Sequence, residues 1–126
     1  MTVADSDVLI DALRGRDPAA SLVARELKAG ALATTVISAF ELLSGARSDA
    51  TREKIERFLA PITVLALDDP AARAAASIRS ALEVAGTPIG TADYLIAGIC
   101  LSRSATLLTR NRAHFEKVPD LRLGEV

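Results

Sequence analysis

Residues 87–115 read TPIGTADYLIAGICLSRSATLLTRNRAHF, and the first half of this segment predicts a buried helix. Pro88 and Gly90 interrupt regular secondary structure, and Thr91 carries a hydroxyl of the kind that commonly caps a helix. Apolar residues then recur at helical spacing over residues 96–101. The pattern indicates a helix that starts with Thr91 as its cap and turns an apolar side inward.

The second half of the segment predicts a strand and a polar loop. The run 105–108 is apolar and short enough for a strand, and the polar residues 109–112 close it. Asp93 then lies in the first turn of the helix, and Asn111 lies just past the carboxyl end of the strand. A carboxylate and an amide, both oxygen ligands for a hard divalent ion, are thus placed near chain reversals.

The composition favours one α/β domain that spans residues 1–126. Half of the residues are hydrophobic but only 3% are aromatic, so the core must be built from Ala, Leu, Ile and Val. A chain of this length buries roughly two thirds of the surface that its unfolded form exposes. The net charge of −1 gives no overall attraction to nucleic acid.

Several classes of protein are disfavoured by the residue counts. A single Cys and a single His exclude a Cys/His zinc site and a disulfide framework built from this chain alone. No apolar run reaches the roughly 20 residues of a membrane helix. The first residues carry Asp5, Asp7 and Asp11 in place of the basic start of a signal peptide. We therefore expect a cytoplasmic protein without a membrane segment.

The rest of the chain alternates between predicted strands and helices, which indicates a largely parallel sheet with right-handed crossovers. A long helix over residues 69–85 should bury a stripe made of Ala74, Ile78, Ala81, Leu82 and Ala85. The predicted strands outside the first segment are residues 2–4, 31–35, 62–67 and 121–123.

Acidic and amide side chains follow these strands. Asp5 comes directly after the first strand, Glu41 lies in the helix after the second, and Asn111 follows a later strand. Asp93 opens a helix at the same edge. Ligands of parallel sheets bind outside the carboxyl ends of the strands, so these four side chains are expected to converge.

Each of these positions also has a purely local explanation. Asp5 is equally consistent with a helix cap, and Asp93 with compensation of the helix dipole. Glu41 has the spacing of a capping box if its helix begins as late as Ser38, although we favour a start near residue 35. Asn111 has the character of a turn residue. Three acids at one sheet edge are nevertheless hard to explain as local caps alone.

Three neighbouring carboxylates repel one another and raise each other's pKa values unless a cation lies between them. Mg²⁺ or Mn²⁺ suits oxygen ligands and phosphate-bearing substrates, whereas zinc prefers His and Cys. Such an ion polarises a phosphoryl oxygen and lowers the pKa of an attacking water, which is the chemistry of phosphodiester hydrolysis.

Four segments of the chain resemble the PIN-domain ribonucleases and, more narrowly, the VapC toxins of prokaryotic toxin–antitoxin pairs. The resemblance implies a PIN-like α/β/α sandwich with a small, mainly parallel sheet. It also implies a Mg²⁺- or Mn²⁺-dependent endoribonuclease that hydrolyses RNA, a homodimer, and inhibition by a cognate VapB-type antitoxin. The segments are DSDVLIDAL (5–13), ELLSGAR (41–47), PIGTADYLIA (88–97) and TRNRAHF (109–115).

The resemblance also assigns roles to single residues. Asp5, Glu41 and Asp93 match the three acids that serve the family as catalytic residues and metal ligands. Asn111 stands where many relatives carry a fourth Asp, which leaves the number of metal ions open. An amide there can still support the site by hydrogen bonding to a metal-bound water.

Four further residues belong to the predicted site or its rim. Ser6 and Thr109 match small hydroxyl residues and are expected to support the metal ligands. Arg110 and Arg112 are candidates for contacts with RNA phosphates, although loop arginines are more often simply solvated. Asp7 replaces the more usual Thr, Ser or Asn, and it either adds charge to the site or points away.

Two other interpretations remain. Asn111 and the near-neutral charge also fit a PIN-like domain that has lost catalysis and binds RNA or protein. A phosphoacceptor receiver domain would need an acceptor Asp at the end of the third strand and a later Lys. Here residues 68–70 read as a helix start, and Arg110 stands in place of that Lys. His114, which has no acid partner nearby in the sequence, is predicted to be a surface residue.

Overall fold

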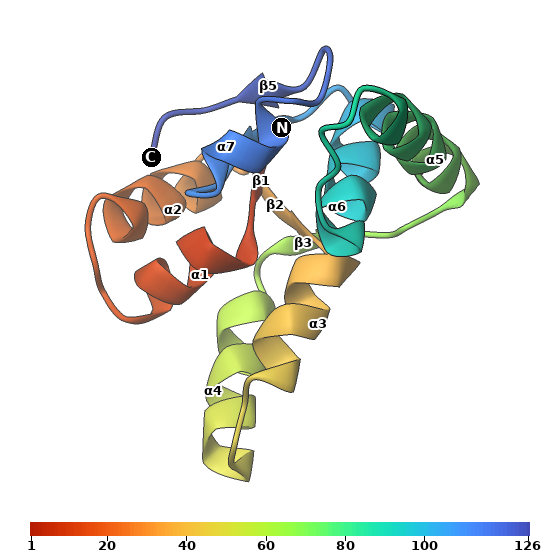
Figure 1. Ribbon diagram of the computed structural model, residues 1–126. Helices are drawn as coiled ribbons and strands as arrows, with labels where there is room; N and C mark the ends of the chain where they lie inside the picture. The colour runs from red at the N-terminus through yellow and green to blue at the C-terminus, as the bar shows by residue number, and fades with distance from the viewer.

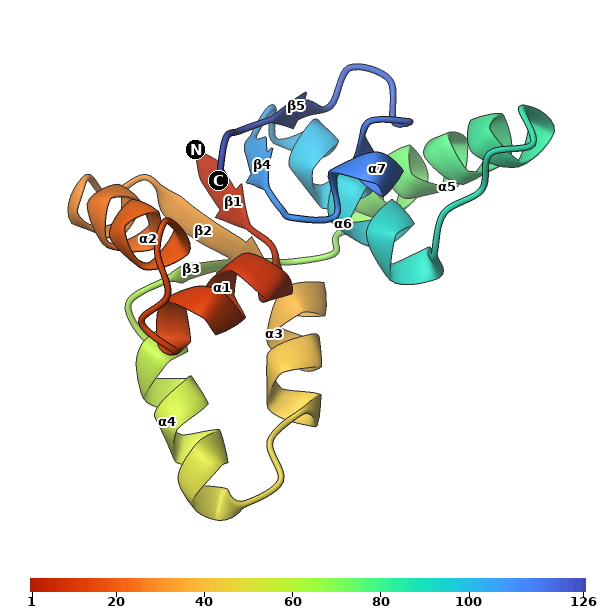
Figure 2. The ribbon, with the colours of Figure 1, turned by 60° about the vertical axis from the view of Figure 1, so that its left-hand side comes forward.

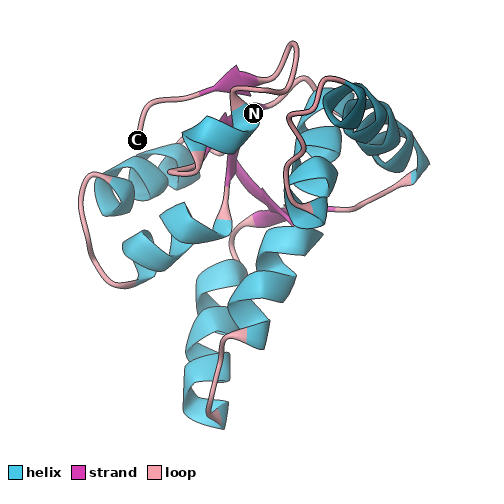
Figure 3. Cartoon of the chain, viewed as in Figure 1, coloured by secondary structure: helices cyan, strands magenta, loops and turns pink.

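The computed structural model describes residues 1–126 and shows a central sheet between two layers of helices (Figures 1 and 3). The strands are β1 (Thr2–Ala4), β2 (Leu32–Thr35), β3 (Thr63–Leu65), β4 (Thr106–Leu108) and β5 (Arg122–Leu123). The helices are α1 (Ser6–Leu13), α2 (Ala19–Lys28), α3 (Val36–Ser44), α4 (Asp49–Leu59), α5 (Asp69–Val84), α6 (Thr91–Ser102) and α7 (Arg112–Phe115).

The sheet has five strands in the order β3-β2-β1-β4-β5, and every neighbouring pair is parallel. The predicted α/β fold with a parallel sheet is therefore confirmed. From β1 in the middle, the chain adds β2 and then β3 toward one edge of the sheet. It then returns to the other side of β1 and adds β4 and β5 toward the opposite edge. The strand order thus reverses between β1 and β4, and in open α/β sheets this is where ligands bind.

The strands send alternate side chains into two separate cores, because successive residues of a strand face opposite sides. Val3 and Leu107 pack into the core beneath α5, α6 and α7. Ala4 and Leu108 pack into the core beneath α1, α2, α3 and α4. The three inner strands, β1, β2 and β4, are therefore buried on both faces, as parallel strands usually are, whereas the edge strands β3 and β5 are partly exposed.

Helices α3 and α4 form an antiparallel pair that projects away from the sheet (Figure 2). Helix α3 begins directly after β2, where the side chain of Thr35 accepts a hydrogen bond from the Ser38 amide at 3.0 Å. The favoured helix start near residue 35 is confirmed. Glu41 is therefore not the acid of a capping box and is free for another role.

The expected cap of α6 is wrong, because Thr91 is already the first helical residue. Gly90 is the N-cap, has an extended backbone, and leaves the helix without a side-chain cap. The hydroxyl of Thr91 is thus one position too late to reach the free amides of the first turn.

The buried stripe of α5 agrees with the expectation only in part. Ile78 and Leu82 are buried as predicted, but Ala81 and Ala85 are exposed and Ala74 is only half-buried. The alanines that complete the buried line are Ala71 and Ala75. An Ala-rich helix carries too weak a contrast between its faces for sequence to locate the buried one.

Close contact between α5 and α6 depends on Gly98. A Cβ atom at this position would lie 2.4 Å from the carbonyl oxygen of Ala71 and 2.8 Å from the Cβ of Ala75. Real side chains do not approach so closely, so only glycine permits the observed separation of the two helices. The packing of α6 in turn fixes Asp93, which lies in its first turn.

The substitution Gly98→Ala is expected to lower the free energy of unfolding by about 1–3 kcal/mol, the usual cost of overpacking. Alanine is intrinsically a better helix former than glycine by about 1 kcal/mol, so helix propensity alone would make the variant more stable. A loss of stability would therefore come from the steric clash between α5 and α6. Urea denaturation of the variant measures it. Gly45→Ala is the matched control, since its nearest neighbour would be 3.5 Å away. Equal stability of the two variants would contradict this account.

Candidate active site

The candidate site lies where β1 and β4 end. The backbone amide of Asp5 donates to the carbonyl of Leu108 at 2.9 Å, which joins the two strands at their carboxyl ends. Asp5 is also the N-cap of α1, so its backbone is extended and its side chain turns back toward the helix start. A strand end and a helix cap together fix the direction of this carboxylate.

The carboxylate of Asp5 is buried, with 6% of the residue exposed, and both oxygens accept hydrogen bonds. Oδ1 accepts from the Ser6 amide at 2.8 Å and, more distantly, from the Ser38 hydroxyl at 3.4 Å. Oδ2 accepts from the Thr109 hydroxyl at 2.8 Å. Residues from β1, α3 and the end of β4 therefore meet at one side chain.

The pKa of the Asp5 carboxyl is raised from 3.8 to about 6. Burial is the largest cause, because removal from water disfavours the charged form. The hydrogen bond from Thr109 opposes the shift, and the negative charges of Asp7 and Glu41 add to it. Asp5 is thus a carboxylate in an apolar and already negative setting, which a cation would stabilise.

Asp7 points into the site, which decides the alternative that the sequence left open. Its Oδ2 accepts from the Arg110 amide at 3.0 Å and lies 3.4 Å from the Thr109 hydroxyl. Its Oδ1 is buried and has no hydrogen-bond partner. The Thr109 hydroxyl has one proton and donates it to Asp5, which is closer than Asp7. Asp7 is therefore held mainly by the backbone amide of Arg110.

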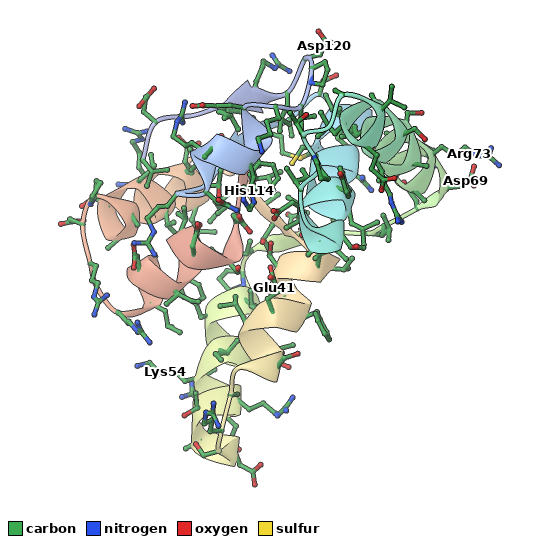
Figure 4. All side chains as sticks on the ribbon, in the orientation of Figure 1. Glu41, Lys54, Asp69, Arg73, His114 and Asp120 are labelled. Carbon is green, nitrogen blue, oxygen red and sulfur yellow. The ribbon has the colours of Figure 1, made fainter.

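Glu41 reaches the same region from α3. Its Oε1 accepts from the Ser6 hydroxyl at 3.2 Å, although the side chain is exposed and has room to move. Figure 4 shows Glu41 and His114 bordering the region between α1, α3 and α6 from opposite sides. Ser6 therefore connects Glu41 to the residue that follows Asp5.

Asp93 belongs to a second group, formed with His114 and Asn111. The Nδ1 atom of His114 lies 2.8 Å from Asp93 Oδ2 and 2.9 Å from the Asn111 side-chain amide. The expectation that His114 lacks an acid partner is therefore wrong, although its side chain is 44% exposed. The sequence carried a signal only for the contact with Asn111, which precedes His114 by three residues and so lies on the same side of this short helix, and it carried none for Asp93.

The two groups are linked by the backbone amide of Asn111, which donates to the Thr109 hydroxyl at 3.0 Å. The links run from Asp93 through His114 and Asn111 to Thr109 and Asp5. As the side chains lie, no three acidic, histidine or cysteine groups converge closely enough to hold a metal ion. The structure thus brings Asp5 beside Glu41 and leaves Asp93 at the other end of this network.

Both arginines that were predicted to contact RNA make contacts within the protein. Arg110 Nη1 lies 3.3 Å from Asp11 Oδ2. Arg112 Nη1 donates to the carbonyl of Gly124 at 2.7 Å, and its Nε lies 3.6 Å from Glu116 Oε1. These contacts tie the loop after β4 to α1 and to the C-terminal segment, and contact with RNA stays a prediction for both residues.

A cleft of about 310 Å³ opens beside Glu41, between α1, α3 and α4. Its floor is apolar, and two exposed cationic side chains, Arg14 and Lys54, stand at its wall. Figure 4 shows Lys54 on α4 and Glu41 on α3. The cleft therefore combines an apolar floor with positive charge next to a candidate catalytic acid.

None of the helices combines the length and the apolar character that a membrane span requires.

Comparison with known proteins shows the family. The PIN domain profile matches residues 2–121. Ribonuclease VapC10 of Mycobacterium tuberculosis is 35% identical over 97% of this chain and 91% of its own length. The tRNA(fMet)-specific endonuclease VapC of Shigella flexneri is 32% identical over 94% of this chain and 92% of its own.

Solved structures agree with these sequence matches. A chain of the DNA-bound VapBC complex of Salmonella typhimurium superposes with a TM-score of 0.86 at 26% identity, covering 98% of this chain and 96% of that one. VapBC2 of Rickettsia felis, bound to a promoter DNA fragment, has the same fold with a TM-score of 0.86 at 21% identity, over 98% and 96% of the two chains. The chain belongs to the PIN domain family and, within it, to the VapC toxins.

Proposed function

We propose that this chain is a metal-dependent endoribonuclease toxin that forms one PIN domain and hydrolyses RNA phosphodiester bonds. The observation that carries the proposal is the buried carboxylate of Asp5, held by three hydrogen bonds where the strand order reverses and raised in pKa by burial and by two neighbouring acids. Strongly perturbed acids in such positions are typical of functional sites. The names of VapC relatives, one a tRNA(fMet)-specific endonuclease, support RNA as the substrate class.

The chemistry of the available donor atoms suits a hard divalent ion, although the three acids would have to draw closer together to bind one. All the candidate ligands are carboxylates or amides, and the buried Oδ1 of Asp7 has no hydrogen-bond partner in the protein. PIN-domain nucleases depend on metal ions, and we propose Mg²⁺, or Mn²⁺, held by Asp5, Glu41 and Asp93. When bound, the ion supplies Lewis-acid polarisation of a phosphoryl oxygen and activation of the attacking water.

The protein's own contribution is to hold these carboxylates in place. Thr109 fixes one oxygen of Asp5, and the Ser6 amide fixes the other. The Ser6 hydroxyl steers Glu41 toward the same region. Because Glu41 is exposed, its side chain can turn toward Asp5 without disturbing the core, whereas Asp5 itself cannot move.

The alternative is a PIN-like module that binds RNA or protein without catalysis. Two observations favour it: Asn111 replaces the fourth acid, and Asp93 is paired with His114 at a distance from Asp5. Metal binding and RNA cleavage by the purified chain separate the two functions.

We further propose three properties of the assembly. The structural relatives are chains of VapBC complexes, which supports inhibition by a cognate VapB-type antitoxin. A homodimer and a cytoplasmic location are consistent with the same family membership.

The cleft beside Glu41 is the proposed path of the RNA strand. Arg14 and Lys54 are exposed at its wall, whereas Arg110 and Arg112 are engaged within the protein. Phosphate contacts by Arg and Lys supply most of the sequence-independent affinity for nucleic acid. We therefore place Arg14 and Lys54 ahead of the loop arginines as phosphate contacts.

Asp5→Asn and Asp93→Asn are each expected to reduce RNA cleavage by at least about 100-fold, because loss of even an outer-shell partner of a metal ligand costs about 10–100-fold. Cleavage of a labelled RNA in Mg²⁺ or Mn²⁺ measures the effect. Glu53→Gln on the exposed side of α4 is the matched control and should cut normally. Undiminished cleavage by either Asp variant contradicts the assigned roles.

Asp5→Asn is also expected to stabilise the metal-free protein at neutral and alkaline pH. The folded pKa of about 6 lies above the unfolded value of 3.8, so the folded state binds more protons between these values. Stability of the parent chain therefore falls as pH rises from about 4 to 6 and stays lower above it, by about 2–3 kcal/mol. The side-chain amide of the variant carries no charge at any of these pH values, so the stability of the variant does not fall in this way.

Urea denaturation in a metal chelator at pH 4 and pH 8 tests this expectation. The two proteins should have similar stability at pH 4, and the variant should be the more stable at pH 8. Added Mn²⁺ should then stabilise only the parent chain. A variant that is destabilised at pH 8 would show that the charge of Asp5 is already compensated within the protein.

Arg14→Ala and Lys54→Ala are expected to weaken binding of single-stranded RNA and to reduce its salt dependence. Each lost phosphate contact should lower the slope of log K against log salt by about 0.7. Binding of a labelled RNA in a metal chelator, at several salt concentrations, measures the slope. Lys28→Ala, whose side chain does not line the cleft, is the control. An unchanged slope in both cleft variants would place the RNA elsewhere.

A further inference from the structure

We propose that His114 is a positioning residue that holds the carboxylate of Asp93 through its Nδ1 atom, and that Asn111 orients the His114 ring instead of binding the ion. The metal-related part of this inference rests on the proposed function, in which Asp93 is a metal ligand. The contact itself stands on the geometry of three side chains from α6, the loop after β4, and α7.

The three side chains lie within direct hydrogen-bonding distance. His114 Nδ1 is 2.8 Å from Asp93 Oδ2 and 2.9 Å from the Asn111 side-chain amide. The Asp93 side chain is only 18% exposed, so little water is available to replace this partner. Asn111 is anchored separately, since its backbone amide donates to the Thr109 hydroxyl. The ring of His114 is thus clamped between an acid and an anchored amide.

The chemistry of these groups decides where the proton lies. An ionised carboxylate only accepts hydrogen bonds, so the short contact with Asp93 requires a proton on Nδ1. The nearest atom of Asn111 is Nδ2, which is also a donor, so the Nδ1–H group can donate to Asn111 only if the amide presents its oxygen instead. The two orientations of an amide differ by a simple exchange of its O and N atoms, so this arrangement needs no movement of the backbone.

This arrangement explains why an amide at position 111 is compatible with an active site. A carboxylate there would place a second negative charge against the nitrogen that already serves Asp93. The amide contacts the ring without adding charge. One oxygen of Asp93 is then occupied by His114, and the other is left for a cation, as in metal sites where outer partners orient the ligand.

The proton position can be measured directly, because the chain contains a single histidine. Protein labelled with ¹⁵N in the imidazole gives one pair of ring nitrogen signals, and long-range ¹H–¹⁵N correlation shows which nitrogen carries the proton. We expect a protonated Nδ1 in the metal-free protein and a change in that signal in Asp93→Asn. A bare Nδ1 with the proton on Nε2 would overturn the proposal, whatever the activity of the protein.

Metal affinity provides the second measurement. His114→Ala removes the donor, whereas the side-chain amide of His114→Asn keeps a donor near the place of Nδ1. Calorimetric titration with Mn²⁺ alone should show affinity about 10–100-fold weaker for the Ala variant and largely restored in the Asn variant. A purely structural role would not be rescued selectively in this way.

The outcomes distinguish this inference from the proposed function. Equal Mn²⁺ affinity of the parent chain and both variants would overturn the positioning role and leave the metal site intact. If the parent chain binds no Mn²⁺, the proposed function fails, and the imidazole signals alone then decide whether His114 holds Asp93.

Discussion

The buried carboxylate of Asp5 is the constraint on which the rest of the structure depends. Its backbone amide joins β1 to β4, its side chain caps α1, and its oxygens hold Thr109 and the Ser6 amide. Burial at this junction raises its pKa to about 6. The carboxylate therefore stabilises the meeting of strands through its hydrogen bonds while its own charge is disfavoured, a conflict that natural proteins tolerate mainly at functional sites.

Most of the fold follows from patterns that are local in the sequence. The inner strands are short and apolar because both of their faces are buried, and each of the first four strands is followed by a helix. Parallel pairing then brings every strand end to one edge, which is why Asp5, Glu41 and Asn111 were expected in one region. No knowledge of side-chain contacts was needed for this step, since topology alone sets it.

What sequence did not provide are features that depend on contacts between distant segments. Which alanines of α5 are buried is set by the close approach of this helix to Gly98, and alanines on every side of the helix give no apolar contrast to reveal them. The pairing of His114 with Asp93 joins residues 21 positions apart. Arg110 and Arg112 have the composition of a nucleic-acid rim, yet the acids and carbonyls that hold them come from α1 and the C-terminal segment.

Two residues near the ends of β1 and β4 depart from what the resemblance to the family leads one to expect. Asn111 brings an amide where an acid was expected, and Asp7 brings an acid where a hydroxyl or an amide was expected. Asp7 Oδ2 accepts from the backbone amide of Arg110, the residue next to Asn111, so the added carboxylate lies against the loop that lacks one. Asp7 therefore supplies a negative charge beside the loop in which Asn111 carries none. Because attraction for a divalent ion depends on the charge and its distance, the Asp7 carboxylate adds to the attraction that Asp5 and Glu41 would exert on an ion at this junction.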